Sequence, residues 1–416
     1  MESLKNLTVM FVTFSPWKNG KRLPTNGNVE PVLNFLVPKV RKMVLVDQPY
    51  PGSDRLLPSF EIYDEKRVYI NNSSFWMYIL WPFLKLVNTG VKTHITFKIR
   101  DFFSVFDYFL SDQTVFDIVI GLESVNTLAG LVLKKLGLVK KVIYYVSDYS
   151  PNRYPEIWFN NIYVWLDRYC AIHADYIWDV SKAIHPARIT AGLDPLYSAS
   201  VLHVPNALYE SQIKQAKLSE IKPYSLVFMG TLGVLNGPEI AIESLHYLKK
   251  KFPKIRLHMI GGYDDDIVRL KSFTTKHKLA DYVIFDGFID DRDKVSQSIR
   301  NFAIALAPYP AVAGSKRFYG DSTKIRAYLA AGLPLITTDV PPLGREAALK
   351  GAALLIKDSP KALAEAITKI FSNKSLFLSL RKKSIAFAKK NTWNNELKKA
   401  FVSMNYNIPS SDVITH

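Results

Sequence analysis

Short runs of hydrophobic residues alternate along the chain with segments of helical periodicity. In the first half, nearly continuous apolar runs occur at residues 7–14, 42–46, 117–120, 142–146, 176–180 and 201–204. The second half repeats this rhythm at residues 225–229, 256–260, 283–285, 303–307, 335–337 and 353–356. Strands of this kind between helices are typical of parallel sheets covered on both faces. Two such sets predict an α/β protein with two doubly wound, Rossmann-like domains.

Local start and stop signals support the helices between these strands. Ser322 can cap a helix that stops at Gly332, where glycine tolerates the left-handed backbone. Gly237 with Pro238 opens a second helix, and Ser359 with Pro360 a third, each followed by apolar residues at core-facing spacing.

The apolar pattern is interrupted between the two sets of strands. The segment ALYESQIKQAKLSEIKP lacks core spacing and ends with a proline before a new strand. We therefore expect an N-terminal domain at residues 1–207, a linker at 208–223 and a second domain at 224–390. Residues 391–416 are predicted to form a C-terminal helix and tail that returns to the first domain, with a frayed polar end.

Composition narrows the class of partner. The 416 residues carry a formal charge of +17, which favours anionic ligands. No nucleic-acid motif is present and the basic residues are spread along the chain, so we expect no nucleic-acid partner. Cys170 is the only cysteine, which excludes an intramolecular disulfide and a cysteine-based metal cluster and fits a cytoplasmic protein.

Residues 75–110 mix many aromatic residues with Lys85, Lys92, Lys98 and Arg100. Such a mixture fits an interface with anionic lipid, and it fits buried helices equally well. No apolar run reaches the length of about 18 to 20 residues that spans a bilayer, and no signal peptide is visible. We therefore expect a soluble or peripheral protein, with contact to the inner face of a membrane left open.

The segment GDSTK, residues 320–324, has the features of an anion site. Free backbone N–H groups at a helix start attract negative charge, and Lys324 would add a cation in the first turn. A lysine here opposes the helix dipole, so a bound anion would explain it. The alternative is an ordinary loop and helix with a solvated lysine.

Other candidate residues lie where parallel strands end, which is where open α/β sheets bind ligands. In the second half these are Gly230, Thr231, Gly262, Phe288, Ile289 and Tyr309. In the first half, Glu123 and Asp148 follow predicted strands, and either can position or deprotonate a hydroxyl. The acidic triplet at residues 264–266 is interpreted as the first turn of a helix rather than a metal site.

The order of motifs resembles the family-4 (group 1) retaining glycosyltransferases of the GT-B fold. The matching segments include VLHVPNALY, LVFMGTLGVLNGPEIAIESL, RLHMIGG, LADYVIFDGFIDDRD, AYLAAGLPLITTDV and GAALLIKDSPKALAEAI, in that order over residues 201–367. The resemblance implies two Rossmann-like domains facing a cleft. It also implies transfer of a sugar from a nucleotide-diphosphate sugar, a UDP- or GDP-sugar, to a saccharide or lipid-linked acceptor hydroxyl, with no metal or cofactor required.

The resemblance also implies roles for individual residues. The backbone at Phe288 and Ile289 would contact the base. The diphosphate would be held by Gly230, Thr231 and the loop Asp321, Ser322, Thr323 and Lys324, near Gly262 and Tyr309. Asp148, in the segment SDYSP, is the preferred acceptor-side carboxylate.

Several residues common in the family are absent. The acidic positions of the phosphate-loop helix correspond to Tyr319 and Ala327, and the usual basic positions of the strand-to-helix loop correspond to Thr231 and Asn236. A frequent histidine near the donor sugar corresponds to Ser147. Lys324 could restore one positive charge, and Asp321 could replace a contact to the sugar.

These departures leave alternatives beside an active transferase. The chain could be a catalytically inactive scaffold that binds a partner transferase, a nucleotide-sugar epimerase of the same fold, or a basic module that binds membrane surfaces. Nucleotide binding and product analysis distinguish them.

Overall fold

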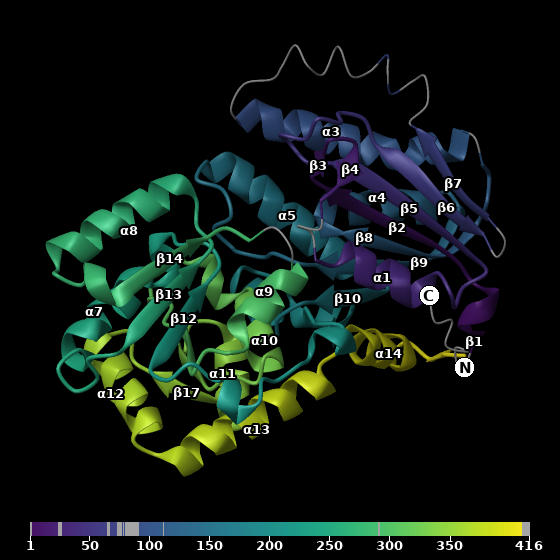
Figure 1. Cartoon of the computed structure of the whole chain (residues 1–416). Helices are drawn as coiled ribbons and strands as arrows, with labels where there is room; N and C mark the ends of the chain where they lie inside the picture. Colours follow the sequence, from purple (N-terminus) through teal and green to yellow (C-terminus); the bar gives the residue numbers. More distant parts are fainter. Residues whose placement is uncertain are drawn as a thin grey trace. The chain divides into compact units, whose positions relative to one another are not determined.

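The computed structural model describes residues 2–23, 27–64, 67–72, 77, 79, 91–110, 112–289 and 292–409. The chain forms two compact units, Met1–Pro205 with Glu396–His416, and Asn206–Asn395 (Figure 1). Each unit has a central sheet flanked by helices. All the segments predicted as strands are strands in the structure, and the predicted α/β class with two Rossmann-like units is confirmed.

The first unit is built on an eight-stranded sheet. Its strands, in spatial order, are β11 (Ser200–His203), β10 (Tyr176–Asp179), β9 (Val139–Val146), β8 (Phe116–Leu122), β2 (Thr8–Ser15), β5 (Lys42–Pro49), β6 (Ser59–Asp64) and β7 (Arg67–Asn72). The six strands from β11 to β5 run parallel, and the central residues of β10, β9, β8, β2 and β5 are buried, whereas those of the edge strand β11 are partly exposed.

The expectation of purely parallel sheets is wrong at one edge of this unit. Strand β6 pairs antiparallel with β5, and β7 pairs antiparallel with β6. Their sequences, SFEIYD and RVYINN, mix apolar and polar residues, as edge strands with one exposed face commonly do. A search for continuous apolar runs therefore missed them.

Helices cover the first sheet. They are α1 (Val29–Leu36), α3 (Val91–Asp107), α4 (Glu123–Lys135), α5 (Ile157–His173) and α6 (Ile184–Thr190). Helix α4 contacts both α3 and α5. A short hairpin, β3 (Trp17–Lys18) and β4 (Lys21–Arg22), follows β2.

The end of the chain packs on the first unit. Helix α14 (Trp393–Ser403) carries Phe401, whose ring lies 5.8 Å from that of Phe35 and 5.4 Å from that of Trp178. Strand β18 (Tyr406–Asn407) then pairs in parallel with β1 (Glu2–Ser3). These contacts place the C-terminal segment beside the start of the chain.

The second unit has a fully parallel six-stranded sheet. In spatial order its strands are β14 (Val283–Gly287), β13 (Arg256–Ile260), β12 (Ser225–Met229), β15 (Ile304–Ala307), β16 (Leu335–Thr338) and β17 (Ala353–Ile356). Its helices are α7 (Pro238–Leu248), α8 (Asp264–Lys276), α9 (Arg292–Ile299), α10 (Thr323–Ala330), α11 (Pro342–Leu349), α12 (Pro360–Phe371) and α13 (Lys374–Lys390).

Two hydrophobic layers enclose this second sheet, because successive strand residues point to opposite faces. Leu226 and Phe228 of β12 pack in the layer that contains α7 and α12. Val227 and Met229 pack in the opposite layer, with α10 and α11. This arrangement brings the start of α10 to the carboxyl end of β12.

The predicted helix starts and stops are confirmed. Ser322 and Ser359 accept hydrogen bonds from backbone N–H groups three residues ahead, and Gly237 precedes Pro238 at the start of α7. Gly332 has φ +65°, so a side chain there would strain the backbone. The segment expected as a linker, residues 208–223, belongs to the second unit, where Gln215 donates to the carbonyl oxygen of Gly332.

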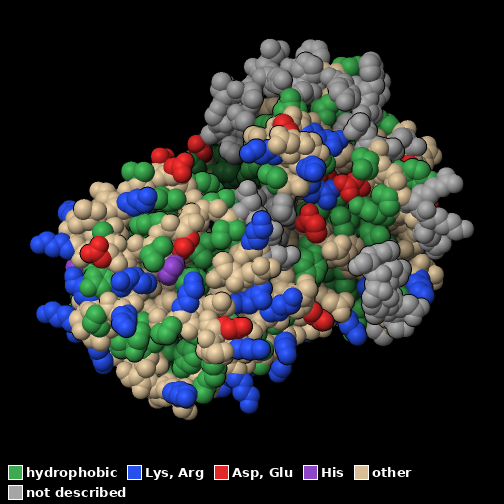
Figure 2. All heavy atoms as spheres, viewed as in Figure 1, with side chains coloured by type: hydrophobic (Ala, Val, Ile, Leu, Met, Phe, Trp, Pro, Cys, Tyr) green, Lys and Arg blue, Asp and Glu red, His purple; other side chains and the backbone are tan. Residues whose placement is uncertain are grey.

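Part of the aromatic and basic segment at residues 75–110 lies outside the described residues; 77, 79 and 91–110 are described. Among the helices that the structure describes, none is long and apolar enough to cross a membrane. Lys and Arg side chains are spread over the face shown in Figure 2 rather than gathered in one patch.

Candidate functional site

The loop before α10 brings polar groups to the start of that helix. The Ser322 hydroxyl oxygen accepts from the backbone N–H of Ile325 at 3.4 Å and lies 2.7 Å from the Tyr309 hydroxyl. Tyr309 follows β15, and the Thr338 hydroxyl donates to its carbonyl oxygen at 2.6 Å. Burial raises the pKa of Tyr309 to about 12, so this phenol is neutral near neutral pH. The hydrogen bond between Ser322 and Tyr309 therefore holds both side chains in place, and the adjacent Thr323 is exposed.

Lys324 is buried without a counterion. Its side chain lies in the first turn of α10, with Nζ 4.3 Å from the ring centroid of Phe228 and 4.5 Å from that of Tyr309. The residue is 8% exposed, and Nζ has no hydrogen-bond partner among the described residues. Burial, with a smaller contribution from Arg317, lowers its pKa to about 7. The aromatic rings offset only part of the cost of burying the ammonium group.

A second cation, which the sequence reasoning missed, lies near Lys324. The guanidinium carbon of Arg317 is 6.0 Å from the centroid of the Tyr309 ring. Within the described part of the chain, no carboxylate lies within ion-pair distance of Arg317. The clue in the sequence was the segment KRF, only a few residues before GDSTK. Lys324 and Arg317 thus lie beside the start of α10, and among the described residues neither forms an ion pair with a carboxylate.

Asp321 points away from solvent and is bound by an arginine. Its carboxylate accepts from Arg326 Nε at 2.8 Å and from Arg326 Nη2 at 3.0 Å. The two side chains are 3% and 6% exposed. Burial raises the pKa of Asp321, and Arg326 opposes that shift. Asp321 therefore fixes the loop to α10 in this structure, and Arg326 is a partner that the sequence reasoning did not identify.

The glycine positions bring two strand ends close together. Gly230 follows β12 with φ +107°, and Gly261 and Gly262 follow β13 with φ +103° and +85°. A Cβ atom on Gly261 would lie 2.6 Å from the carbonyl oxygen of Gly230, so only glycine fits there. Thr231 is exposed and accepts a hydrogen bond from the Asn236 amide at 2.8 Å.

Phe288 and Ile289 follow β14 and differ in burial. The Phe288 ring is 71% exposed, whereas Ile289 is partly buried against the core layer that contains α10. An exposed phenylalanine and the adjacent backbone can contact a planar base. The acidic triplet Asp264–Asp266 forms the first turn of α8, as predicted, and Asp266 pairs with Arg269 at 3.3 Å.

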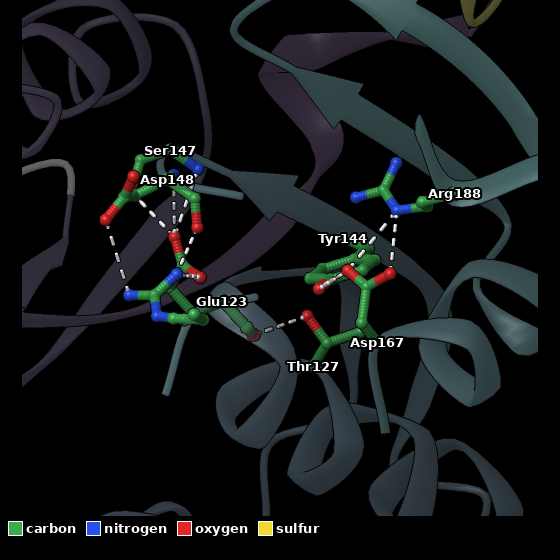
Figure 3. Close-up of polar contacts among 8 residues, drawn as sticks. Glu123, Thr127, Tyr144, Ser147, Asp148, Asp167 and Arg188 are labelled. Atoms are coloured by element: carbon green, nitrogen blue, oxygen red, sulfur yellow. Dashed lines mark hydrogen bonds and ion pairs between the residues drawn. The ribbon is translucent and has the colours of Figure 1, made fainter. Parts of the chain in front are cut away.

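In the first unit, Glu123 joins two strand ends. It follows β8 with φ +67°, a conformation that is strained for a residue with a side chain. One carboxylate oxygen accepts from Ser147 N, Ser147 Oγ and Asp148 N at 3.1, 2.8 and 3.1 Å (Figure 3). The side chain is 9% exposed. Glu123 therefore holds the loop that follows β9.

Arg153 completes this cluster and was not identified from the sequence. Its Nη1 lies 3.4 Å from the second carboxylate oxygen of Glu123, and its Nη2 lies 3.7 Å from the Asp148 carboxylate. These carboxylates raise the pKa of Arg153 against the effect of burial. The side chain of Asp148 is 47% exposed, so Asp148 is the carboxylate accessible to a ligand.

A second polar cluster in the first unit is fully buried. Arg188 donates to both oxygens of Asp167 through Nε and to both oxygens of Asp179 through Nη1. The Tyr144 hydroxyl donates to Asp167 at 2.6 Å (Figure 3). Because these groups have almost no exposed surface, they fasten α5 and α6 to the sheet rather than meet a ligand.

Solved structures share this architecture over nearly the whole chain. Anabaena HepE, solved in complex with UDP-glucose, has a TM-score of 0.62 at 13% identity, over 96% of this chain and 100% of that one. The lipopolysaccharide outer core galactosyltransferase WaaB has a TM-score of 0.59 at 14% identity, over 96% of this chain and 100% of that one.

Sucrose-phosphate synthase from Thermosynechococcus elongatus has a TM-score of 0.59 at 14% identity, over 74% of this chain and 78% of that one. No curated protein matches the sequence. A family model described as group 1 glycosyl transferases matches residues 223–373, within the second unit. The chain therefore has the GT-B fold, and residues 223–373 of its second unit are similar to the group 1 glycosyl transferases.

Proposed function

We propose that the protein is a glycosyltransferase that moves a sugar from a UDP-sugar to an acceptor hydroxyl, with retention at the anomeric carbon. The family match in the second unit and the similarity to HepE, solved with UDP and UDP-glucose, support this class of reaction. The observation that carries the proposal is Lys324, whose buried Nζ has no hydrogen-bond partner among the residues that the structure describes. A bound diphosphate would supply that partner.

In this proposal the second unit binds the donor. Lys324 and Arg317 face the diphosphate, together with the backbone at Ser322 and Thr323. The positive end of α10 and these cations stabilise the charge that develops on the leaving diphosphate. Asp321 acts as a positioning residue through Arg326, because its carboxylate is already bonded.

The glycine-rich strand ends let the backbone approach the ligand closely. Gly230, Thr231 and Gly262 border the diphosphate, and Tyr309 holds the Ser322 hydroxyl in place. Phe288 and Ile289 contact the base. Within the described part of the chain, no cluster of His, Cys, Asp and Glu side chains is suited to hold a metal ion.

The first unit binds the acceptor, a saccharide or a lipid-linked sugar, at the carboxyl ends of β8 and β9. Asp148 accepts a hydrogen bond from the attacking hydroxyl and takes its proton as the new glycosidic bond forms and the bond from the anomeric carbon to the diphosphate breaks. The hydroxyl bonds on the face that the diphosphate leaves, so the configuration is retained. Glu123 and Arg153 hold the Asp148 loop, since both make several contacts to it. An anionic membrane surface is a proposed partner for the lipid-linked case.

The donor site is tested by calorimetric titration with UDP, GDP, ADP and TDP. UDP binding is expected, and Lys324→Met should weaken it by about ten- to a hundredfold, because one charge-assisted contact contributes roughly 1.5–3 kcal/mol. Lys350→Met, at an exposed lysine that ends α11, is the matched control and should bind UDP normally. If no nucleotide binds the native protein, the donor site is wrong.

Product analysis then separates the alternatives. A transferase forms a new glycoside only when an acceptor is added, whereas an epimerase converts the free UDP-sugar. An inactive scaffold gives neither product.

A further inference from the structure

Helix α5 is apolar on its exposed side as well as on its buried side. Its buried face is formed by Tyr163, Cys170 and Ala171, together with the Asp167 carboxylate that binds Arg188. A surface helix normally presents polar residues on the opposite face. Here that face carries Trp158, Ile162, Trp165, Tyr169 and Ile172.

The spacing of these residues places them in one stripe. The intervals between them are four, three, four and three residues, which keeps them within a narrow arc of a helix with about 3.6 residues per turn. Trp158 is 53% exposed and Trp165 is 55% exposed. The Trp165 ring stacks on Tyr169 at 5.7 Å, so the exposed rings are ordered against one another.

Neighbouring elements extend the stripe and add positive charge. Leu136, at the end of α4, is 63% exposed, and Lys135 beside it reaches the Tyr169 hydroxyl at 3.4 Å. Arg168 lies at the edge of the stripe and donates to the carbonyl oxygen of Gly192. Asp175, which follows α5, is paired with Lys134 at 2.6 Å.

We infer that this stripe docks the protein on an anionic lipid bilayer. Tryptophan and tyrosine favour the headgroup region of a membrane, where the ring is shielded and its polar atom stays hydrated. Lys135 and Arg168 complement the negative charge of the surface, as does the chain's formal charge of +17. A second copy of the same stripe is disfavoured as the occupant, because it would bring like charges together.

The stripe begins beside the proposed acceptor loop. Asn160, in the first turn of α5, accepts from the N–H groups of Arg153 and Tyr154 and donates to the carbonyl oxygen of Pro151. A bilayer under Trp158 therefore lies close to the loop that carries Asp148. Presentation of a lipid-linked acceptor to this loop rests on the proposed function. Docking of the stripe on a bilayer does not depend on it.

The test measures co-sedimentation of the full chain with vesicles. Vesicles of phosphatidylcholine and phosphatidylglycerol in equal parts should bind the native protein, more strongly at low salt, and pure phosphatidylcholine should bind it far less. Trp158→Ser with Trp165→Ser should reduce the partition coefficient at least about tenfold, because two aromatic side chains leave the interface. Lys135→Glu with Arg168→Glu should abolish the preference for anionic vesicles.

A matched control replaces Tyr247, an exposed aromatic residue on α7, with Ser and should leave the partition unchanged. Vesicles with brominated acyl chains should quench tryptophan fluorescence in the native protein and much less in the double tryptophan variant. UDP titration and circular dichroism verify that each variant is folded, independently of vesicle binding.

Three results would overturn the inference. The native protein could ignore anionic vesicles at low salt, or the double tryptophan variant could bind them as well as the native protein does. Alternatively, sedimentation velocity could reveal a dimer that the tryptophan substitutions dissociate, which would assign the stripe to a second copy of the chain. Loss of UDP binding with vesicle binding intact would instead contradict the donor site alone.

Discussion

Single residues in this protein are held in conformations or environments that cost stability, and both main examples lie at a proposed site. Lys324 has a buried ammonium group with no partner among the described residues, and Glu123 has a left-handed backbone. Strain of this kind persists only where the surrounding structure imposes it. Lys324 therefore allows a test in which ligand binding and stability change in opposite directions, and Glu123 allows a test of backbone strain.

Lys324 should make stability depend on pH. Its pKa is about 7 in the folded protein, against about 10.4 in an unfolded chain. Between these values the unfolded chain binds more protons, so the free energy of unfolding rises with pH, by up to about 1.4 kcal/mol per pH unit. The penalty is fully present below pH 7 and disappears as the pH approaches 10.

Lys324→Met removes this titration. Urea unfolding at pH 7 and pH 9 should show the variant more stable than the native protein at pH 7, with the difference shrinking at pH 9. An equal difference at both pH values would mean that Lys324 is protonated and paired in solution.

Glu123 combines a strained backbone with four polar contacts. Glu123→Ala should lower the free energy of unfolding by about 2–3 kcal/mol, since it leaves Arg153 and the Ser147 and Asp148 N–H groups without their acceptor. Glu123→Gly loses the same contacts but relieves the backbone, and should be about 1 kcal/mol more stable than Glu123→Ala. Urea denaturation of both variants measures the difference, and equal stabilities would contradict backbone strain at this position.

At the scale of elements, the residues that cap the start of α10 also belong to the proposed diphosphate site. Its first turn is held by Ser322 and Tyr309 on one side and by the Asp321–Arg326 pair on the other. Residues 321–324 were proposed as an anion site from local pattern alone. The pattern indicated the helix start correctly but did not reveal which residues support it.

Ser322→Ala should destabilise the protein by about 1 kcal/mol through loss of the helix cap. It should also weaken UDP binding, because the first turn that presents the N–H groups would fray. Thr323→Ala, at the adjacent exposed position, is the control for stability and should have a smaller effect on unfolding. Thermal unfolding with and without UDP measures both effects. If UDP raises the melting temperature of Ser322→Ala as much as that of the native protein, the helix cap does not contribute to UDP binding.

At the scale of the whole molecule, each unit has its own sheet and its own means of fastening helices to it. In the first unit Arg188 pairs with two buried carboxylates, and in the second unit two apolar layers enclose the sheet. We therefore expect substitutions at these positions to affect one unit selectively.

Arg188→Met should cost about 3–5 kcal/mol, because it leaves Asp167 and Asp179 buried without a cation. Arg345→Met is the contrasting control: its pair with Asp339 is exposed, and its loss should cost less than about 1 kcal/mol. Hydrogen exchange should show lost protection in α5 and α6 for Arg188→Met, with strands β12 and β13 unaffected. Uniform loss across both units would mean that they unfold together.

The local pattern of the sequence determined much of this fold. Apolar runs predicted all the parallel strands described in the two main sheets. Ser322, Gly237 and Ser359 indicated the starts of three helices. These features depend on residues a few positions apart, so they can be read from a single chain. The mixed-polarity edge strands β6 and β7 lacked that signal.

The tertiary structure alone decided which charges are paired and which are not. The sequence around Asp321 does not indicate that its carboxylate pairs with Arg326. It also does not indicate that Lys324 lacks a hydrogen-bond partner among the described residues. The environment of Lys324 is built by β12 and β15, and contacts such as that between Met229 and the Tyr328 hydroxyl join residues 99 positions apart. The sequence by itself thus determined the elements and the place of the loop. The apolar environment of Lys324 came from long-range packing, because only the folded chain brings the rings of Phe228 and Tyr309 around its ammonium group.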